Sequence, residues 1–343
     1  MANALLQLIL SVVIVLTVNA IGFKYNILIY LPSLDHKEKF KNKVVNTGGL
    51  VLFIYFIIIN FFELQNIDFY YSFFITSVFL IGILSDLRNI NANIRLFLIS
   101  IITLIFVVLS NNLLLDLQFD VMNNLLKNYF PISILFTTLC IVILINGINF
   151  IDGVHGLAIF YSMTVLFLLN YFIYYVLGID PYIESGIALL PILFILFIFN
   201  INEKLFFGDS GSYLMGCILA IYIIRITNID EYSYPYLYAN FLIYPAFEVF
   251  FSIFRKISIN KSPYGPDNQH LHQLLQGFFV RKNVNLKKAK IISGISINIS
   301  VIIFSMIAIS FYENKYFLIL NIFSFAIFYC STYLLLNKNS KKN

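Results

Sequence analysis

Long apolar runs separated by short polar stretches make up almost the whole chain. A membrane-spanning helix needs about 20 mostly apolar residues, whereas each strand of a membrane barrel would be about 10 residues of alternating polarity. The runs are longer and apolar on all sides, so we expect an all-α integral membrane protein, a polytopic bundle of about 11 transmembrane helices. The eleven runs are 4–23, 46–64, 69–84, 95–115, 131–148, 157–177, 185–201, 210–227, 233–254, 291–311 and 316–336; the third is short, and 116–130 could be an interfacial piece.

The composition agrees with a membrane protein. The 343 residues are 60% hydrophobic and only 11% charged, against about 25% charged in soluble domains. The first run has no Lys or Arg before it and no small-residue cleavage site, so we expect a retained span rather than a signal peptide. The three cysteines fall inside apolar runs and predict neither a disulfide framework nor a metal site. One polytopic domain over residues 1–343 is the simplest organisation.

The distribution of Lys and Arg predicts the orientation. With eleven spans, the odd-numbered loops and the C-terminal tail carry 19 of the 22 Lys and Arg residues, and only Lys127, Arg225 and Lys315 fall on the other side. Positively charged loops stay in the cytoplasm. We therefore expect the N-terminus outside and the C-terminus in the cytoplasm.

Four polar clusters, far apart in the sequence, fall on the predicted cytoplasmic face at the ends of helices. Non-helical backbone at membrane depth is tolerated only where it is buried in protein or lines a wet cavity, so four such clusters on one face favour a shared site. They are Asp86 in "GILSDLRN", Asp152 in "NFIDGVHGL", Asp209 in "FFGDSGSYLMG", and Asp267 with His270 and His272 in "SPYGPDNQHLHQLL".

Each cluster taken alone also has a purely structural interpretation. Asp86 beside Arg88 could be a loop ion pair. Asp209 before Ser-Gly-Ser could be a helix N-cap. His270 and His272 are two positions apart, which is not one helical face, and could be a solvated surface.

The stretch around Asp152 is harder to explain structurally. Asn146, Asn149 and Asp152 are spaced three apart, so in a helix they share one face. Gly153 and Gly156 suit a turn because glycine enters positive φ without strain. A polar stripe at the end of an apolar helix predicts a polar cavity.

The residue types indicate the chemistry of that cavity. Carboxylates and asparagines are hard oxygen ligands suited to Mg²⁺, with Mn²⁺ as an alternative. Histidines and basic residues bind phosphate oxygens, and the helix opened by Gly-Asp-Ser-Gly-Ser favours anions. Together they predict metal-assisted phosphoryl transfer with one lipidic substrate. Glu248, the only acidic residue well inside a run, is either a hydrogen-bonded interior group or part of a pathway.

Here the motifs become recognisable. "GILSDLRNINANIRL", "NGINFIDGVHGLA", "FGDSGSYLMG" and "PDNQHLHQLL" resemble, in order and topology, the polyprenyl-phosphate N-acetylhexosamine-1-phosphate transferases. The resemblance covers residues from about 45 to 275. It implies that a polyprenyl phosphate attacks the β-phosphate of a UDP-N-acetylhexosamine, releasing UMP at the cytoplasmic face. The resemblance further implies that the donor is UDP-N-acetylglucosamine or its 6-deoxy derivative and that the product enters an O-antigen-like pathway. A homodimer is possible, and we expect no nucleic-acid partner.

The resemblance also implies a role for individual residues. Asp209 is the expected Mg²⁺ ligand, with Asn149 or Asp152 near the metal or nucleotide. The implied catalytic residues are Asp86, Asp152 and His270; the metal residues are Asn149 and Asp209; and the substrate-binding residues are Asn146, Gly153, His155, Gly211, Asp267 and His272.

Two positions depart from the family pattern. Ser85 stands where the family has the first Asp of a pair, which excludes a covalent aspartyl intermediate there. His155 stands where the family has Asp or Asn, near the nucleotide or sugar.

Three other interpretations compete with an active transferase. The chain could be a catalytically inactive member, a nucleotide-sugar or lipid-linked sugar transporter, or a structural subunit that docks a partner through its basic 255–290 loop.

Overall fold

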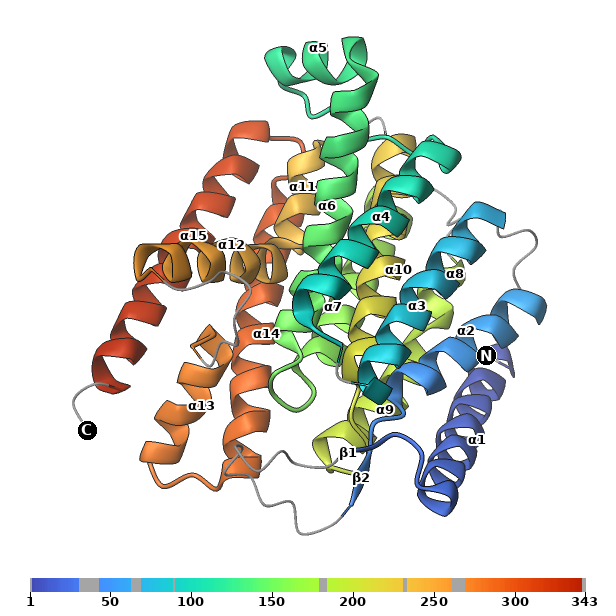
Figure 1. The fold of residues 1–343 in the computed structure, drawn as a ribbon. Coiled ribbons are helices and arrows are strands. Elements are labelled where there is room, and N and C mark those ends of the chain that lie inside the picture. Colours follow the sequence, from blue (N-terminus) through green and yellow to red (C-terminus); the bar gives the residue numbers. More distant parts are fainter. Residues whose placement is uncertain are drawn as a thin grey trace.

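The chain folds into a helical bundle in the computed structural model, which describes residues 2–30, 43–62, 69–88, 90–178, 184–230, 233–260 and 269–340. Its helices run mostly side by side (Figure 1). They are α1 (Ala2–Tyr25), α2 (Gly48–Phe62), α3 (Phe69–Arg88), α4 (Ala92–Ser110), α5 (Asp120–Asn128), α6 (Phe130–Ile151), α7 (Leu157–Tyr171) continued by the π-helix η1 (Phe172–Val176), α8 (Glu184–Ala188), α9 (Leu190–Ile201), α10 (Gly208–Ile229), α11 (Pro235–Phe241), α12 (Ile243–Ser258), α13 (Leu271–Arg281), α14 (Leu286–Ser310) and α15 (Lys315–Ser340).

Every predicted apolar run coincides with a helix or a pair of helices, so the all-α polytopic class is confirmed. Within the described part of the chain, eight helices are long and apolar enough to cross a membrane. Two shorter apolar helices, Gly48–Phe61 and Gly186–Ile201, and one bent pair account for the other three runs. The count of eleven spans and the orientation remain predictions. The run at 69–84 is longer than expected, because α3 extends to Arg88.

The run at 233–254 is not the single straight span that the sequence predicted. It forms α11 and α12, which meet at 74°, and α12 runs across the bundle axis (Figure 1). Pro245 lies in the first turn of α12. Proline has no N–H, and its ring clashes with the carbonyl four residues earlier, which is that of Phe241. That carbonyl instead accepts a hydrogen bond from the Tyr161 hydroxyl at 2.7 Å, so the break leaves no unpaired acceptor there.

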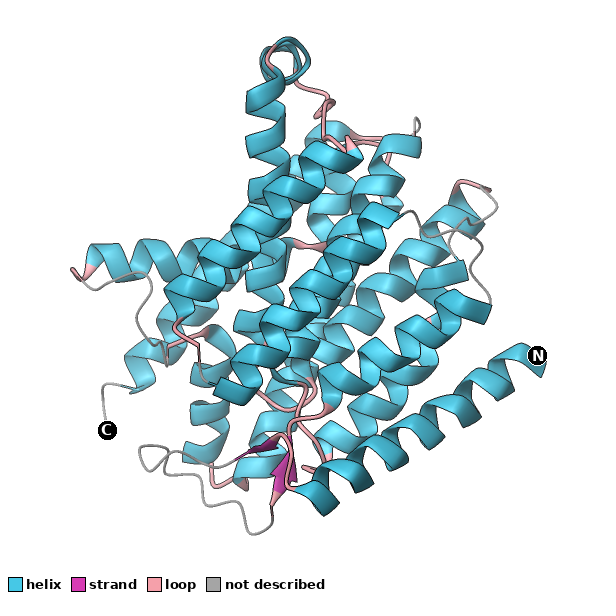
Figure 2. Cartoon of the chain, turned by 45° about the vertical axis from the view of Figure 1, so that its right-hand side comes forward, coloured by secondary structure: helices cyan, strands magenta, loops and turns pink. Residues whose placement is uncertain are grey.

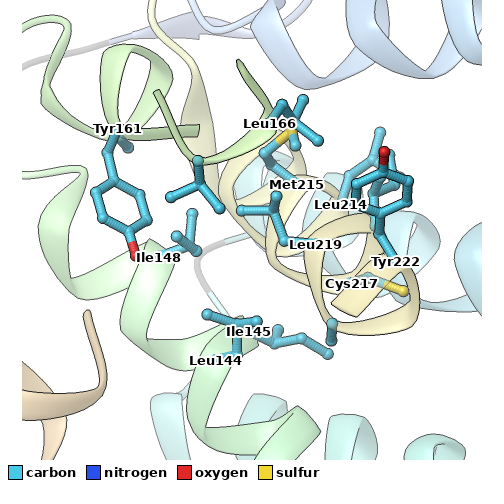
Figure 3. Close-up of a cluster of buried hydrophobic side chains, with 14 of the residues drawn as sticks. Leu144, Ile145, Ile148, Tyr161, Leu166, Leu214, Met215, Cys217, Leu219 and Tyr222 are labelled. Carbon is cyan, nitrogen blue, oxygen red and sulfur yellow. The ribbon is translucent and has the colours of Figure 1, made fainter. Parts of the chain in front are cut away.

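Helix α10 forms the centre of the bundle. Its membrane-length segment is the most buried of the eight, at 89%, and it packs against α2, α3 and α6. Figure 3 shows part of this core, in which side chains of α6, α7 and α10 interdigitate. The first turn of α10 is therefore surrounded by the ends of other helices.

A two-stranded ribbon closes the end of the bundle opposite α5 (Figures 1 and 2). Strands β1 (Ile29–Tyr30) and β2 (Val44–Val45) pair antiparallel, with Ile29 opposite Val45. The Phe206 N–H donates to the Val45 carbonyl at 2.8 Å, and the Gly48 N–H donates to the Phe206 carbonyl at 2.9 Å. The ribbon thus joins the start of α2 to the segment that enters α10.

The charge distribution and the position of α5 predict a topology that fusions can test. A reporter inserted at Lys127 should lie outside the cell, and one fused after Asn343 should lie in the cytoplasm, because positive loops are retained inside. Alkaline phosphatase and green fluorescent protein activities measure the two locations. An insertion at Glu203 is the control and should behave like the C-terminal fusion. Reports from one side by the Lys127 and Asn343 fusions would contradict the orientation.

Candidate active site

Asp86, at the end of α3, caps the N-terminus of α10. Its Oδ1 accepts the Asp209 N–H and the Asn46 Nδ2, both at 2.9 Å, and its Oδ2 accepts the Ser210 N–H at 3.0 Å. The first N–H groups of a helix have no partner within the helix, and a negative charge is favourable there. Asp86 therefore binds another helix instead of forming the alternative loop ion pair with Arg88.

The approach to this cap requires a glycine. Gly208 has a φ of +75°, which L residues rarely adopt. A Cβ at this position would lie 2.4 Å from the Asn46 Oδ1 and 2.8 Å from the Asp86 Oδ2. Any side chain here would push apart the groups that cap α10.

Asp209 lies in the first turn of α10, but it is not the cap. Its Oδ2 accepts the Ser85 hydroxyl at 2.6 Å and forms an ion pair with Arg95, and its Oδ1 accepts the Asn149 Nδ2 at 2.7 Å. Arg95 also donates to the Ser85 Oγ at 3.1 Å and lies over the Tyr213 ring. Three helices thus converge on one carboxylate, which argues against the N-cap interpretation of Asp209.

These groups line a cavity of about 580 Å³. Six of the residues predicted from sequence contribute to its wall, although they come from three separate segments of the chain. They are Asp86, Asn149, Asp152, Gly153, His155 and Asp209, joined there by Asn46, Ser85 and Lys290.

Asp152 is the least satisfied carboxyl group of the cavity. It follows α6 as the C-cap residue, and its side chain accepts no hydrogen bond from the described residues. Desolvation raises the pKa of Asp152 well above its ordinary value, and the nearby Asp209 and Asp86 carboxylates raise it further. A cation or a proton at this position would relieve the repulsion.

His155 lies in the same turn and is buried. Its ring stacks on Phe206 at 5.6 Å between centroids, and its Nε2 is 3.3 Å from the Glu203 Oε1. Burial lowers the pKa of His155 to about 3, with further lowering by Lys290 and Lys287. The partly exposed Glu203 carboxylate does not offset these effects, so the imidazole is neutral at physiological pH.

The histidine segment reaches the same turn from α13. His270 and His272 are 8% and 0% exposed, and their rings are parallel at 5.4 Å between centroids. The two side chains can point the same way because His270 is the N-cap residue, whose backbone is extended and not yet helical, before α13 begins. The solvated-surface interpretation is therefore wrong. A Cβ on Gly153 would lie 2.4 Å from the His272 Nε2, so glycine permits this contact.

Four of the predicted residues that the structure describes do not line the cavity. Two are His270 and His272, which lie behind its wall, with His272 against Gly153. The other two are Asn146 and Gly211. Asn146 donates its Nδ2 to the Val142 carbonyl of its own helix at 2.8 Å. Gly211 packs against the Phe207 ring, where a Cβ would be 2.5 Å from a ring carbon. Asp267 lies outside the described residues.

The sequence did not single out Arg95, Asn46 or Lys290 as site residues. Arg95 is part of the quoted "GILSDLRNINANIRL" motif, but it lies at the start of an apolar run, where a single positive charge is common. Asn46 and Lys290 border apolar runs far from any motif. An isolated polar residue at the edge of an apolar run was the only available signal. Their partners come from distant helices, which the pattern along one helix does not reveal.

The donor atoms suit a divalent cation of the Mg²⁺ type. Among the described residues, no three His, Cys, Asp or Glu side chains form a closed metal site. Mg²⁺ instead takes one or two carboxylates and leaves positions for substrate oxygens. The Asp152 carboxylate fits this requirement, as does the Asn46 Oδ1, which is buried with no hydrogen-bond partner. Asn149 uses its Nδ2 toward Asp209 and Ser212, so its Oδ1 is not consumed by these bonds.

Comparison with known proteins agrees with this geometry. Residues 69–227, which carry three of the four motifs, match the model of glycosyl transferase family 4. The predicted resemblance is thereby confirmed over these residues.

Three relatives illustrate the match. An undecaprenyl-phosphate alpha-N-acetylglucosaminyl 1-phosphate transferase of Thermotoga maritima is 25% identical over 71% of this chain and 72% of its own length. A decaprenyl-phosphate N-acetylglucosaminephosphotransferase of Mycobacterium leprae is 28% identical over 42% of this chain and 41% of its own. An Escherichia coli O157:H7 protein with the same name as the Thermotoga relative is 23% identical over 59% and 57%. The chain thus aligns with well under two thirds of the second and third relatives.

The neutral, buried His155 predicts how stability depends on pH. Its pKa in the folded state is about 3, below the ordinary 6.5, so the unfolded chain binds more protons between these values. Stability should therefore fall as the pH drops below about 6.5, by up to about 1.4 kcal/mol per pH unit from this residue. Thermal unfolding in detergent at pH 7.5 and pH 5 should show a smaller loss for His155→Gln than for wild type. Equal losses would contradict the assignment.

Proposed function

We propose that the protein transfers N-acetylhexosamine 1-phosphate from a UDP-sugar to a polyprenyl phosphate, releasing UMP. The observation that carries this proposal is the cavity itself, where carboxylates from the ends of three apolar helices meet within the part of the chain that matches glycosyl transferase family 4. A volume of about 580 Å³ lies within the range of small-molecule sites. The names of the relatives support a polyprenyl-phosphate acceptor and an N-acetylglucosamine donor.

The cavity provides charges of both signs for such a reaction. Lys290 lines the cavity, and Arg95 lies behind its wall on Asp209. Such cationic groups suit diphosphate oxygens. Asp86, Asp152 and Asp209 supply the opposite charge, so anionic substrates would need a further cation to bind beside them. We propose that Asp209 and Asp152, with asparagine oxygens, hold Mg²⁺ there. When bound, it would neutralise charge on the transferring phosphoryl group.

The chain's own residues favour direct attack by the lipid. An oxygen of the polyprenyl phosphate forms a bond to the β-phosphorus, the bond between that phosphorus and the bridging oxygen breaks, and UMP leaves with the oxygen. The lipid phosphate has a second pKa near 6 and is largely dianionic at pH 7, so it needs no strong base. The Ser85 hydroxyl donates a hydrogen bond to Asp209, and we assign it the role of positioning that carboxylate.

The donor and the pathway belong to the same proposal. UDP-N-acetylglucosamine or a 6-deoxy derivative is the proposed donor, and the product would initiate an O-antigen-like polysaccharide in the bacterial inner membrane. The active site would face the cytoplasm, where UDP-sugars are made. Purified protein with undecaprenyl phosphate, Mg²⁺ and a panel of UDP-sugars should release UMP from one donor class. Flux of a UDP-sugar into liposomes without turnover would instead favour the transporter.

Metal dependence is the first kinetic prediction. EDTA should abolish UMP release, and Mg²⁺ or Mn²⁺ should restore it. Asp209→Asn should lower the rate by about 10²-fold or more, the scale of losing one strong electrostatic element. Because the pKa of Asp152 is raised, protons should compete with the metal, and half-saturation should need more Mg²⁺ at pH 6 than at pH 8. Turnover that is insensitive to EDTA would refute the metal assignment.

The second kinetic prediction separates Ser85 from Asp86. Ser85→Ala removes one hydrogen bond to Asp209, worth about 1 kcal/mol, or roughly five- to tenfold in rate. Asp86→Asn should cost much more, because it removes a charge while keeping a side chain that can still cap α10. Asp86→Ala, which also removes the cap, should in addition lower the unfolding temperature. The UMP release rate should fall below about pH 6 with the lipid dianion. A Ser85→Ala variant as inactive as Asp86→Asn would exclude direct attack.

A further inference from the structure

Glu248 is a buried carboxylate that the proposed reaction has not used. It is 1% exposed and lies in α12, beyond the bend at Leu242. Burying a carboxylate is costly unless it is paired and hydrogen-bonded. The partners of Glu248 therefore indicate why the chain keeps an acid at this position.

Glu248 interacts with the Tyr329 hydroxyl of α15, and its other partners belong to or touch the histidine segment. The Glu248 Oε1 accepts the Leu271 N–H at 3.2 Å and the Tyr244 hydroxyl at 3.1 Å. Its Oε2 is 3.0 Å from the His270 Nδ1. The His272 Nδ1 lies 3.9 Å from the Glu248 Oε1. One carboxylate thus holds the first turn of α13 and the His270 imidazole, and it lies close to the His272 imidazole.

The segment that Glu248 holds contacts the wall of the active-site cavity. The His270 ring lies 5.4 Å from the ring of Phe150, in the last turn of α6, and His272 closely approaches Gly153, which lines the cavity. A change in the position of His270 or His272 would therefore be transmitted to the turn that carries Asp152.

We propose that Glu248 is a positioning residue that sets the orientation of His270 and His272 next to the active site. In this role Glu248 is a hydrogen-bonded interior group and not part of a transport pathway. A carboxylate beside one ring nitrogen fixes the orientation of the imidazole. The inference rests on the proposed function for its kinetic test, because His272 packs against Gly153, in the turn that lines the proposed substrate cavity.

Glu248→Gln tests this role with little change in shape. The glutamine oxygen can still accept a hydrogen bond from the Leu271 N–H. Its NH₂ group, however, cannot accept a hydrogen bond from the His270 ring. Turnover should fall by about 10- to 100-fold, the usual cost of removing a group that orients a functional histidine. UMP binding, counted by isothermal titration calorimetry, should keep wild-type stoichiometry, because the cavity itself is intact. Amide exchange of residues 269–276 should become faster, since the first turn of α13 loses its anchor.

Asp230→Asn is the matched control. Asp230 is also an acid that accepts a tyrosine hydroxyl, from Tyr238, but it follows the far end of α10. This variant should keep wild-type turnover and wild-type exchange in residues 269–276. Tyr244→Phe removes the hydroxyl that donates to Glu248 and lies 3.4 Å from the His272 Nδ1. It should cost less than Glu248→Gln, because the carboxylate stays in place.

The outcomes separate this inference from the function it rests on. If Glu248→Gln turns over within about twofold of wild type, or exchange in 269–276 is unchanged, the positioning role is wrong. If turnover falls only in proportion to the number of UMP sites, Glu248 is merely structural and the inference is equally overturned. If wild-type protein neither binds nor releases UMP, the proposed function fails, while the exchange experiment still decides whether Glu248 anchors α13.

Discussion

The hydrogen bonds from the first turn of α10 to the Asp86 carboxylate hold the active-site end of the bundle together. In a membrane protein the free N–H groups of a buried helix end cost several kcal/mol if they are unsatisfied. α3 satisfies them, so its last turn must lie against the start of α10. That contact also places Ser85 beside Asp209 and fixes one wall of the cavity.

The balance of charge in the cavity follows from that arrangement. The Ser85 Oγ is 2.6 Å from the Asp209 Oδ2, so a carboxylate at position 85 would meet another at hydrogen-bonding distance. A hydroxyl donates there instead, and Arg95 is shared between the two residues. Where the resemblance implies a pair of acids, the chain thus has an acid, a hydroxyl and a guanidinium. This set can orient phosphates but supplies no carboxylate nucleophile at position 85.

The same device occurs twice in this bundle. Asp86 from α3 holds the first turn of α10, and Glu248 from α12 holds the first turn of α13. In both cases a carboxylate on an apolar helix accepts a backbone N–H at the start of a different helix, where negative charge is favoured. The first contact places Ser85 beside Asp209 at the cavity, and the second places the histidine segment against Gly153 in the cavity wall. The bend before Pro245 matters for the second, because Glu248 lies on the arm that follows it.

The sequence by itself determined the helical membrane class, the positions of the apolar runs, and the convergence of Asp86, Asp152 and Asp209 at helix ends. It could do so because helix length and the cost of burying charge act along one segment of chain. The tertiary structure alone decided that Asp86 caps α10, that Arg95 pairs with Asp209, and that the 233–254 run bends. These features depend on which helices touch. Asp86 and Asp209, whose backbone N–H donates to it, are 123 positions apart. A pattern of residues along one helix cannot predict a contact over that separation.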